Sequence, residues 1–406
     1  MFLSWLAAYG KIPAVCRVQY CALWKTIDCE GVQVNKKKNK LSEMNDAELT
    51  PEAREAEKKR RNKRARRRKA GRVIDRIFGF ILVTVIVVGL AALGLWYILM
   101  KGPSTSLRDT WAMTMLETRR FTWTPNIFLT VDEVAEIRAR TRKHVSEEFD
   151  ASLITITAPS DETDDDGKPK PDAYGLVDED GDGIVVQNIK GNGFVGYLIT
   201  ILDPTRVFVG MPDGYGGGGM ILDDMVAKYD ALGGINAGGF VDEGGGGSGG
   251  MPDGLTIIDG VYWNEGYGGD SFVGFDDKGV LHVGYYTAAE ARAMNIVNGV
   301  SFYPILIING KIVDDDMLVS GVNPRTAIGQ RADGAVLMLC IDGRQVHSIG
   351  GTYLDAAQVL LDHGAINACN LDGGSSSVMY YNGGYVNSPS SASGISRYLP
   401  NAFLFK

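Results

Sequence analysis

The hydrophobic pattern of the chain is strongest at residues 77–100. This stretch reads IFGFILVTVIVVGLAALGLWYILM and contains no charged residue across 24 positions. As an α-helix, 24 residues extend about 36 Å, which is enough to cross a hydrocarbon core of roughly 30 Å. A buried core helix is the alternative, but such helices are shorter as a rule. The pattern therefore predicts a single transmembrane helix over residues 77–100.

From residue 196 onward the pattern changes to short apolar runs that are broken by glycines. Runs such as GYLITIL, PILIING and AVLMLCIDG have the length and composition of buried strands. Two helices are expected among them, one over residues 220–230 and one that begins at Thr352 with Asp355 as a capping pair and ends before Gly364. Many strands with few helices indicate an α+β domain, with a mixed β-sheet and flanking helices.

Residues 101–195 show less regular periodicity, and we expect a stalk or N-terminal extension with some structure. Thr130 and Glu133 form a capping box at the start of an amphipathic helix. Further on, residues 178–183 read DEDGDG, which resembles the first half of a calcium-binding loop. Ile189 stands where that loop requires a bidentate Glu, so an acidic turn that enters a strand at residues 184–189 is the favoured interpretation.

Charge divides the chain at the apolar stretch. Residues 1–76 carry 20 Lys/Arg and 9 Asp/Glu, whereas residues 77–406 carry 21 and 40. Eleven of the basic residues lie in residues 58–72, directly before the apolar stretch. Basic flanks stay on the cytoplasmic side, so we expect a signal-anchor protein of the cell membrane with an extracellular C-terminal domain. Beside a span, such a basic run favours contact with anionic headgroups over nucleic acid.

These patterns predict four regions. Residues 1–76 form a cytoplasmic basic segment, 77–100 the transmembrane helix, 101–195 the extracytoplasmic extension and 196–406 the main domain. Residues 1–43 have no clear periodicity, and translation from Met44 is an alternative to translation from Met1. Cys340 and Cys369 lie in strand-like runs, where they form either a disulfide between neighbouring strands or two buried thiols.

Polar residues gather at the ends of four predicted strands. The segments are GGINAGGF at 233–240, NPRTAIGQ at 323–330, CIDGR at 340–344 and NACNLDGGSSS at 367–377. Glycines at such positions let a ligand approach the backbone, and Asp and Arg supply charge. No Ser-His-Asp arrangement or metal-ligand spacing is apparent.

In their order and spacing, these segments resemble the phosphodiester glycosidase family. The family pattern contains Arg-Thr-Ala-x-Gly, which matches residues 325–329, Asp-Gly-Arg, which matches 342–344, and Asn-Leu-Asp-Gly-Gly, which matches 370–374. A late Arg397 and the Asn-Ala pair at 401–402 complete it. Two departures occur. Ser375 stands where a third Gly is usual, and in the segment where the family has Asn-Gly-Gly followed by an aromatic residue, Ala237 separates Asn236 from the paired glycines. The resemblance covers about residues 230–406.

The resemblance implies hydrolysis of the glycosidic bond of a sugar-1-phosphodiester, such as N-acetylglucosamine-1-phosphodiester in a cell-envelope polysaccharide. Turn N–H groups, serine hydroxyls and a bidentate arginine would bind the phosphate, asparagines would hold the sugar, and a carboxylate would act at the anomeric carbon. The implied catalytic residues are Asp372, Asp342 and Arg325. The implied substrate-binding residues are Asn236, Gly238, Gly239, Thr326, Asn370, Gly373, Gly374, Ser375, Ser376 and Arg397.

Each candidate also has a structural interpretation. Asp372 could cap its own turn, Asp342 could mark a hairpin, and Arg325 could be a buried ion-pair partner of either aspartate. At the level of function, the alternatives are a non-catalytic binder of phosphorylated envelope glycans and a metal-dependent phosphodiesterase that uses the same acids. We expect no cofactor for the glycosidase, whereas the phosphodiesterase would need a divalent cation.

Overall fold

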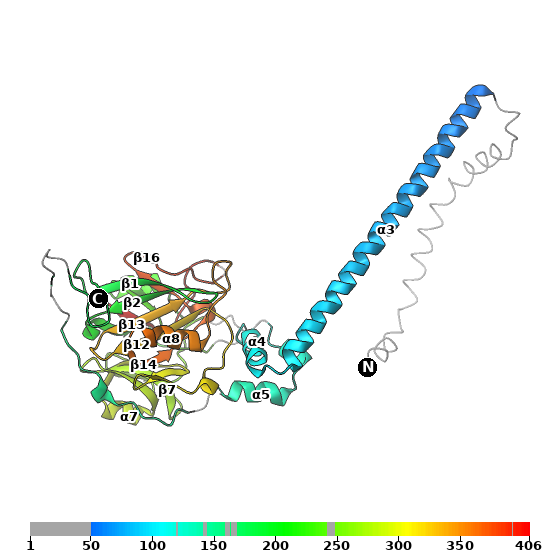
Figure 1. Ribbon diagram of the computed structural model, residues 1–406. Coiled ribbons are helices and arrows are strands. Elements are labelled where there is room, and N and C mark those ends of the chain that lie inside the picture. Colours follow the sequence, from blue (N-terminus) through cyan, green and yellow to red (C-terminus); the bar gives the residue numbers. More distant parts are fainter. Residues whose placement is uncertain are drawn as a thin grey trace. The chain divides into compact units, whose positions relative to one another are not determined.

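The computed structural model describes residues 50–118, 121–140, 144–158, 163, 169–241, 248–391 and 393–406. Residues 1–43, for which an alternative start was considered, lie outside this part of the chain. The chain divides into two compact units, residues 1–93 and 94–406. Figure 1 shows the helices and sheets of both units, coloured along the sequence.

The first unit contains most of one long helix. Helix α3 runs from Pro51 to Lys101 and includes both the basic residues and the predicted span. Most of its apolar side chains are exposed, with Phe80 at 74% and Leu95 at 71% of their full accessible area. By length and composition this helix can cross a membrane.

The second unit contains three antiparallel sheets. A seven-stranded sheet has the order β1-β2-β13-β12-β14-β10-β11, and two five-stranded sheets have the orders β16-β15-β4-β17-β3 and β6-β5-β9-β7-β8. All pairings among the described strands are antiparallel, which differs from the mixed sheet that the sequence predicted. The strands of the large sheet are β1 (Ile184–Lys190), β2 (Val195–Ile201), β10 (Ile305–Ile308), β11 (Lys311–Ile312), β12 (Arg325–Arg331), β13 (Val336–Ile341) and β14 (Ala365–Asn370).

The other strands and the helices complete the unit. The five-stranded sheets contain β3 (Val207–Gly210), β4 (Gly233–Asn236), β15 (Met379–Tyr381), β16 (Gly384–Tyr385) and β17 (Ala402–Phe405) in one, and β5 (Thr256–Ile258), β6 (Val261–Asn264), β7 (Asp270–Asp276), β8 (Leu281–Tyr286) and β9 (Ile296–Ser301) in the other. The helices are α4 (Thr105–Glu117), α5 (Val131–Arg140), α6 (Leu222–Lys228), α7 (Ala288–Ala293) and α8 (Tyr353–Asp362).

One hydrophobic core joins all three sheets, and α8 packs into it through Ala356, Ala357 and Leu360. The strands β12 and β13 are buried over their whole length, which explains the continuous apolar run of β13, whereas β12 buries the polar side chains of Arg325, Thr326, Gln330 and Arg331. The predicted capping box at Thr352 and Asp355 is present, and the left-handed φ of +88° at Gly364 follows the end of α8.

Two local expectations are resolved by the strand order and the turn geometry. Cys340 on β13 and Cys369 on β14 are separated by β12 and are free, buried thiols. The acidic turn before β1 is also present, because the carboxylate of Asp178 accepts hydrogen bonds from the backbone N–H groups of Gly181 and Gly183 at 3.0 and 2.9 Å. β1 itself pairs with β2 over seven residues, so this part of the expected extension belongs to the large sheet.

The helices α4 and α5 form a small core of their own. Met113, Leu116, Val134 and Ile137 are buried in it, and Met100 from the end of α3 packs with them. The buried carboxylate of Asp109 on α4 accepts a hydrogen bond from Arg140 Nη1 of α5 at 2.7 Å, which ties the two helices together. The predicted capping box at the start of α5 is present as well.

Helix α4 also docks closely on the loop that precedes β12. Thr114 Oγ1 accepts a hydrogen bond from Val322 N at 3.0 Å, and the Glu117 carboxylate accepts one from Gly321 N at 3.2 Å. A Cβ atom at position 321 would lie 2.3 Å from the backbone N and Cα of Thr114. A glycine is therefore needed at this contact.

We expect Gly321→Ala to lower the free energy of unfolding by about 1–3 kcal/mol, because the added methyl group forces α4 away from the loop. Chemical denaturation would measure this change, and faster hydrogen exchange in α4 would locate it. Gly384→Ala is the matched control, since a Cβ atom there meets no atom within 4 Å. Equal stability of the two variants would contradict the close docking.

Candidate active site

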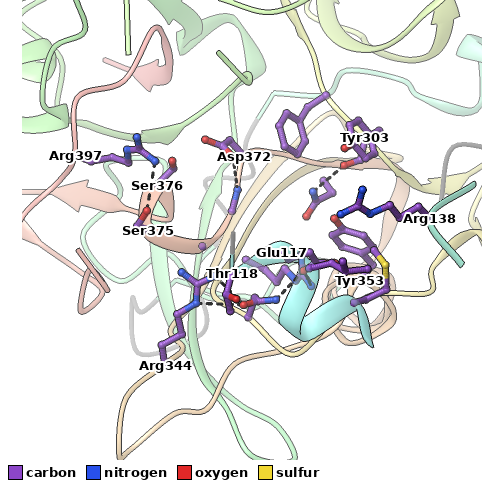
Figure 2. A pocket seen from close by; sticks show the side chains of 18 residues that line it. Glu117, Thr118, Arg138, Tyr303, Arg344, Tyr353, Asp372, Ser375, Ser376 and Arg397 are labelled. Carbon is purple, nitrogen blue, oxygen red and sulfur yellow. Dashed lines mark hydrogen bonds and ion pairs between the residues drawn. The ribbon is translucent and has the colours of Figure 1, made fainter. Parts of the chain in front are cut away.

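A pocket of about 380 Å³ lies where α4 and α5 meet the loop that precedes β12 and the loops that follow β9, β13 and β14 (Figure 2). Its described lining combines two carboxylates with four arginines, together with asparagines, serines and aromatic rings. The carboxylates are Glu117 and Asp372, and the arginines are Arg138, Arg325, Arg344 and Arg397. This excess of positive side chains makes the pocket suitable for an anion, although residues 77–406 as a whole are acidic.

Asp372 stands at the end of β14, in the turn that the sequence singled out. Its backbone N–H donates to Ala237 O at 3.0 Å, and one carboxylate oxygen accepts a hydrogen bond from Gly373 N at 3.0 Å. The side chain is half-buried and lines the pocket (Figure 2). Thus the carboxylate makes an Asx-type contact within its turn and also faces the cavity.

The turn after Asp372 brings backbone close to two arginines. Gly374 has a φ of +65°, and its N–H donates to Pro324 O at 2.9 Å. A Cβ atom at Gly374 would lie 3.2 Å from Arg344 Nη2, so the guanidinium packs directly against this glycine. Arg397 Nη1 donates to Ser375 Oγ at 3.4 Å on the other side of the turn. Two guanidinium groups therefore flank the turn, while the N–H groups of Gly373 and Gly374 are engaged with Asp372 Oδ1 and Pro324 O.

Asn236 holds this turn from inside. Its buried side chain donates from Nδ2 to the backbone oxygen of Asp372 at 2.5 Å. Its Oδ1 accepts hydrogen bonds from Thr326 Oγ1 at 2.8 Å and from Val378 N at 3.0 Å. Neither Asn236 nor Thr326 is among the lining residues, so the structure places both behind the pocket wall.

The glycines that follow Asn236 also lie behind the wall. Gly238 N donates to Asn401 Oδ1 at 2.7 Å, and a Cβ atom at Gly239 would lie 3.1 Å from the ring of Phe302. Phe302 lines the pocket and stacks on Tyr303, with ring centroids 5.4 Å apart. Gly239 therefore leaves room for an aromatic wall of the cavity.

Arg325 is buried in an ion pair with a residue that the motifs did not include. Its Nη2 lies 2.9 Å from Glu117 Oε2, and it also donates to the backbone oxygens of Gly321 and Gly351. Burial lowers the pKa of Arg325, but the charge of Glu117, the nearby Tyr353 and the hydrogen bonds to both together outweigh this effect, so the pKa is raised. The ion-pair alternative for Arg325 is therefore present, with Glu117 as the partner instead of an aspartate.

Sequence reasoning missed Glu117 because it ends a helix outside the region of the family resemblance. No motif surrounds it, and its role depends on how α4 docks. Arg344 was part of a quoted motif but was not named as a site residue. Loss of solvent contact and the nearby charge of Arg325 lower the pKa of Arg344, as expected for a cluster of like charges.

Asp342 lies outside the described pocket lining. Its buried Oδ1 accepts hydrogen bonds from Ser388 N at 2.9 Å and Asn387 Nδ2 at 3.2 Å, and His347 Nε2 lies 3.2 Å from Oδ2. These contacts tie the end of β13 to the segment after β16. The structure thus brings together Asp372 and Arg325 in one pocket and leaves Asp342 behind it.

Two buried polar atoms of the lining lack a hydrogen-bond partner within the described protein. They are Asn370 Oδ1 and Ser376 Oγ, and both residues are 1% exposed. Asn370 Nδ2, in contrast, donates to Tyr303 O at 2.9 Å and to Leu371 O at 2.8 Å, which fixes the orientation of the amide. An unpaired buried polar atom costs about 1–3 kcal/mol, so a polar ligand would bind favourably at these two positions.

The described residues contain one group of three carboxylates that could hold a metal ion, at Asp178, Asp180 and Asp182. These residues precede β1 and do not line the pocket. The pocket itself offers a hard cation two carboxylates, of which Glu117 is already paired with Arg325. This donor set fits an anionic ligand better than a resident metal.

Part of the chain matches a known protein family. Residues 229–406 match the family model of the phosphodiester glycosidases. An uncharacterized protein from the SPbeta prophage of Bacillus subtilis (strain 168), YomE, is 35% identical over 147 residues, a match that covers 33% of this chain and 22% of that protein.

Solved structures give weaker matches. The zebrafish N-acetylglucosamine-1-phosphodiester alpha-N-acetylglucosaminidase catalytic domain, auto-inhibited by its pro-peptide, is 20% identical with a TM-score of 0.48, over 59% of this chain and 86% of that one. A hypothetical protein from Synechocystis is 16% identical with a TM-score of 0.44, over 55% and 62% of the two chains. The family match and the ordered motifs lead to one conclusion, that residues 229–406 are a domain of the phosphodiester glycosidase family.

Proposed function

We propose that the protein hydrolyses the glycosidic bond of a sugar-1-phosphodiester, of which N-acetylglucosamine-1-phosphodiester is the model. The observation that carries the proposal is the pocket itself. It joins a half-buried carboxylate, two arginines on a glycine turn and two buried polar atoms without protein partners. A glycosyl phosphodiester presents the matching groups, since it has one anionic phosphate and a sugar rich in hydroxyl groups.

In this proposal the phosphate lies against the turn at residues 373–376. Arg344 and Arg397 flank that turn, and Ser375 and Ser376 add hydroxyl donors. Ser376 Oγ would donate its unused hydrogen bond to a phosphate oxygen. Arg325 remains paired with Glu117, and this pair keeps α4 in place.

The sugar would lie between Asp372 and the aromatic wall of Phe302 and Tyr303. Asn370 Oδ1 would accept a hydrogen bond from a sugar hydroxyl or acetamido N–H group. Apolar sugar faces pack well on aromatic rings, and Tyr303 is 39% exposed. Asn236 and Thr326 contribute by holding the Asp372 turn from behind.

The reaction breaks the bond between the anomeric carbon and the phosphate oxygen. Asp372 takes a proton from a water molecule, the water oxygen forms the new bond to the anomeric carbon, and the phosphate monoester leaves with the bonding electron pair. The monoester is already a good leaving group, so a strong general acid is not required. Asp342 supports the loop that carries Arg344 and does not contact the substrate in this scheme.

We also propose that α3 anchors the domain in the cell membrane, with the N-terminus in the cytoplasm and an envelope glycan as the natural substrate. The support is the apolar helix and the basic residues 58–72 that precede its apolar part. The pocket would then face extracytoplasmic glycopolymers.

Asp372→Asn should lower kcat by about 10²–10⁴-fold with little change in KM, because it removes the base and keeps the shape of the turn. The assay is release of N-acetylglucosamine from its methyl-phosphodiester. Asp362→Asn on the exposed end of α8 is the control and should retain full activity. Unchanged turnover in Asp372→Asn would rule out the assigned base, and turnover absent from the native protein would favour the glycan-binding alternative.

Arg397→Gln and Arg344→Gln should each raise KM by roughly ten- to a hundredfold, since each removes a charge-assisted hydrogen bond to phosphate. Lysine at either position should restore part of the affinity. Arg292→Gln, which alters an exposed ion pair with Glu265, serves as the control. Wild-type KM values in both pocket variants would contradict the assigned phosphate site.

Chelation should leave turnover unchanged, because the pocket lining offers too few free carboxylates for a resident metal. The measurement is kcat after dialysis against EDTA, with and without added Ca²⁺, Mg²⁺ or Mn²⁺. Loss of activity that one of these ions restores would instead support the metal-dependent phosphodiesterase.

A further inference from the structure

A second cavity adjoins the candidate active pocket. It encloses about 510 Å³ along one face of α5 and is called the α5 groove here. The groove shares two lining residues with the active pocket, Leu116 of α4 and Arg138 of α5. These two side chains therefore border both cavities.

The chemistry of the groove differs from that of the active pocket. Val131, Val134, Ala135 and Ala139 line it, and their spacing places them on one side of α5. Val131 is 75% exposed, so this apolar surface is not covered by the described protein. Arg138 marks the boundary between the apolar groove and the pocket that carries the charged groups. The two cavities together fit a molecule that is anionic at one point and apolar beyond it.

The groove is built on the same small core that receives the end of α3. Helix α3 ends at Lys101 and α4 begins at Thr105. Trp96 and Met100 of α3 pack in one cluster with Leu116 and Val134. The proposed span at residues 77–100 ends 16 positions before Leu116, the first residue that lines the groove.

The segment between α4 and α5 presents further apolar side chains. Phe121, Trp123 and Ile127 are 46%, 62% and 48% exposed. Thr122 and Asn126 of the same segment line the groove, and water solvates the exposed apolar side chains next to them in the sequence poorly. Tryptophan at such a position is typical of a protein segment at a membrane interface.

We propose that the α5 groove binds the apolar part of a lipid-like sugar-1-phosphodiester, in which the phosphate joins the sugar to an apolar alcohol. The proposal rests on the proposed function, because it places the phosphate at Arg344 and Arg397. The sugar then occupies the side of Asp372, and the alkyl chain passes Leu116 and Arg138 into the groove. The bond that breaks is still the one between the anomeric carbon and the phosphate oxygen, so the alkyl phosphate monoester is the second product.

The test compares the methyl and octyl phosphodiesters of N-acetylglucosamine-1-phosphate with the full chain in lipid nanodiscs. Both esters are used below the concentration at which they aggregate. The octyl ester should show a KM lower by roughly tenfold or more, because several methylene groups leave water. Its kcat should match that of the methyl ester, since the two leaving groups are equally acidic.

Two variants separate the groove from simple partition of the octyl ester into the bilayer. Ala135→Gln puts a bulky polar side chain into the groove and should abolish the tenfold difference in KM. Glu136→Gln places the same side chain one residue further along α5, at a position that is 74% exposed and outside the groove, and should preserve the difference. The methyl ester should be hydrolysed equally well by both variants.

The outcomes separate a failure of the proposed function from a failure of the groove assignment. Hydrolysis of neither ester would overturn the proposed function and the groove assignment with it. Hydrolysis of both esters with equal KM would overturn the groove assignment alone and leave the proposed function standing. A lower KM for the octyl ester that persists in Ala135→Gln would also overturn it, because the preference would then arise from the bilayer or another surface.

Discussion

The candidate site depends on the buried carboxamide of Asn236, which links two sheets by hydrogen bonds. Asn236 ends β4 of one five-stranded sheet, Thr326 belongs to β12 of the seven-stranded sheet, and Asp372 follows β14 of that same sheet. The single side chain of Asn236 hydrogen-bonds to both of the others. Since a buried amide left unpaired costs about 1–3 kcal/mol for each group, these strand ends can shift only together. The direction in which Asp372 faces is thus fixed by the register of two sheets.

The second constraint comes from outside the region that matches the family. Helix α4 contributes Glu117, which forms an ion pair with Arg325 in the lining of the pocket. Burying such a pair brings little net stability, but removing one partner leaves an unpaired charge in the protein. The main effect of the Glu117–Arg325 pair is to position α4, and with it α5, at the edge of the cavity. The family domain alone would present a more open site.

The sequence predicted helices and strands correctly where capping residues or apolar runs gave a clear local signal. Capping boxes at Thr130 and Thr352 marked the starts of α5 and α8, and apolar runs marked most strands of the large sheet. The pairing direction of those strands was not predicted correctly, since a short apolar run does not encode whether its neighbour is parallel or antiparallel. Helix α4 was missed because its buried face follows from docking on Gly321 and Val322 and shows no clear periodicity.

The sequence also indicated part of the candidate site. Motif order led to Asp372, Asn370, Arg397 and the serines, which the structure collects in one pocket. The same motifs could not separate side chains that face the cavity from those that support it, such as Asn236 and Asp342. That distinction depends on the direction of each side chain at a strand end, and a change of one residue reverses it. Glu117 depends on a contact between residues about two hundred positions apart, for which one sequence carries no signal.

The central claim is that Asp372 and the two arginines act on one bound sugar phosphate. An experimental structure of the Asp372→Asn variant with the methyl-phosphodiester of N-acetylglucosamine tests this claim directly. The account predicts phosphate oxygens within hydrogen-bond distance of Arg344, Arg397 and Ser376. It also predicts an anomeric carbon about 3–3.5 Å from residue 372 or from a water molecule that this residue holds. A ligand bound elsewhere, or bound in this pocket with its anomeric carbon facing away from residue 372, would contradict it.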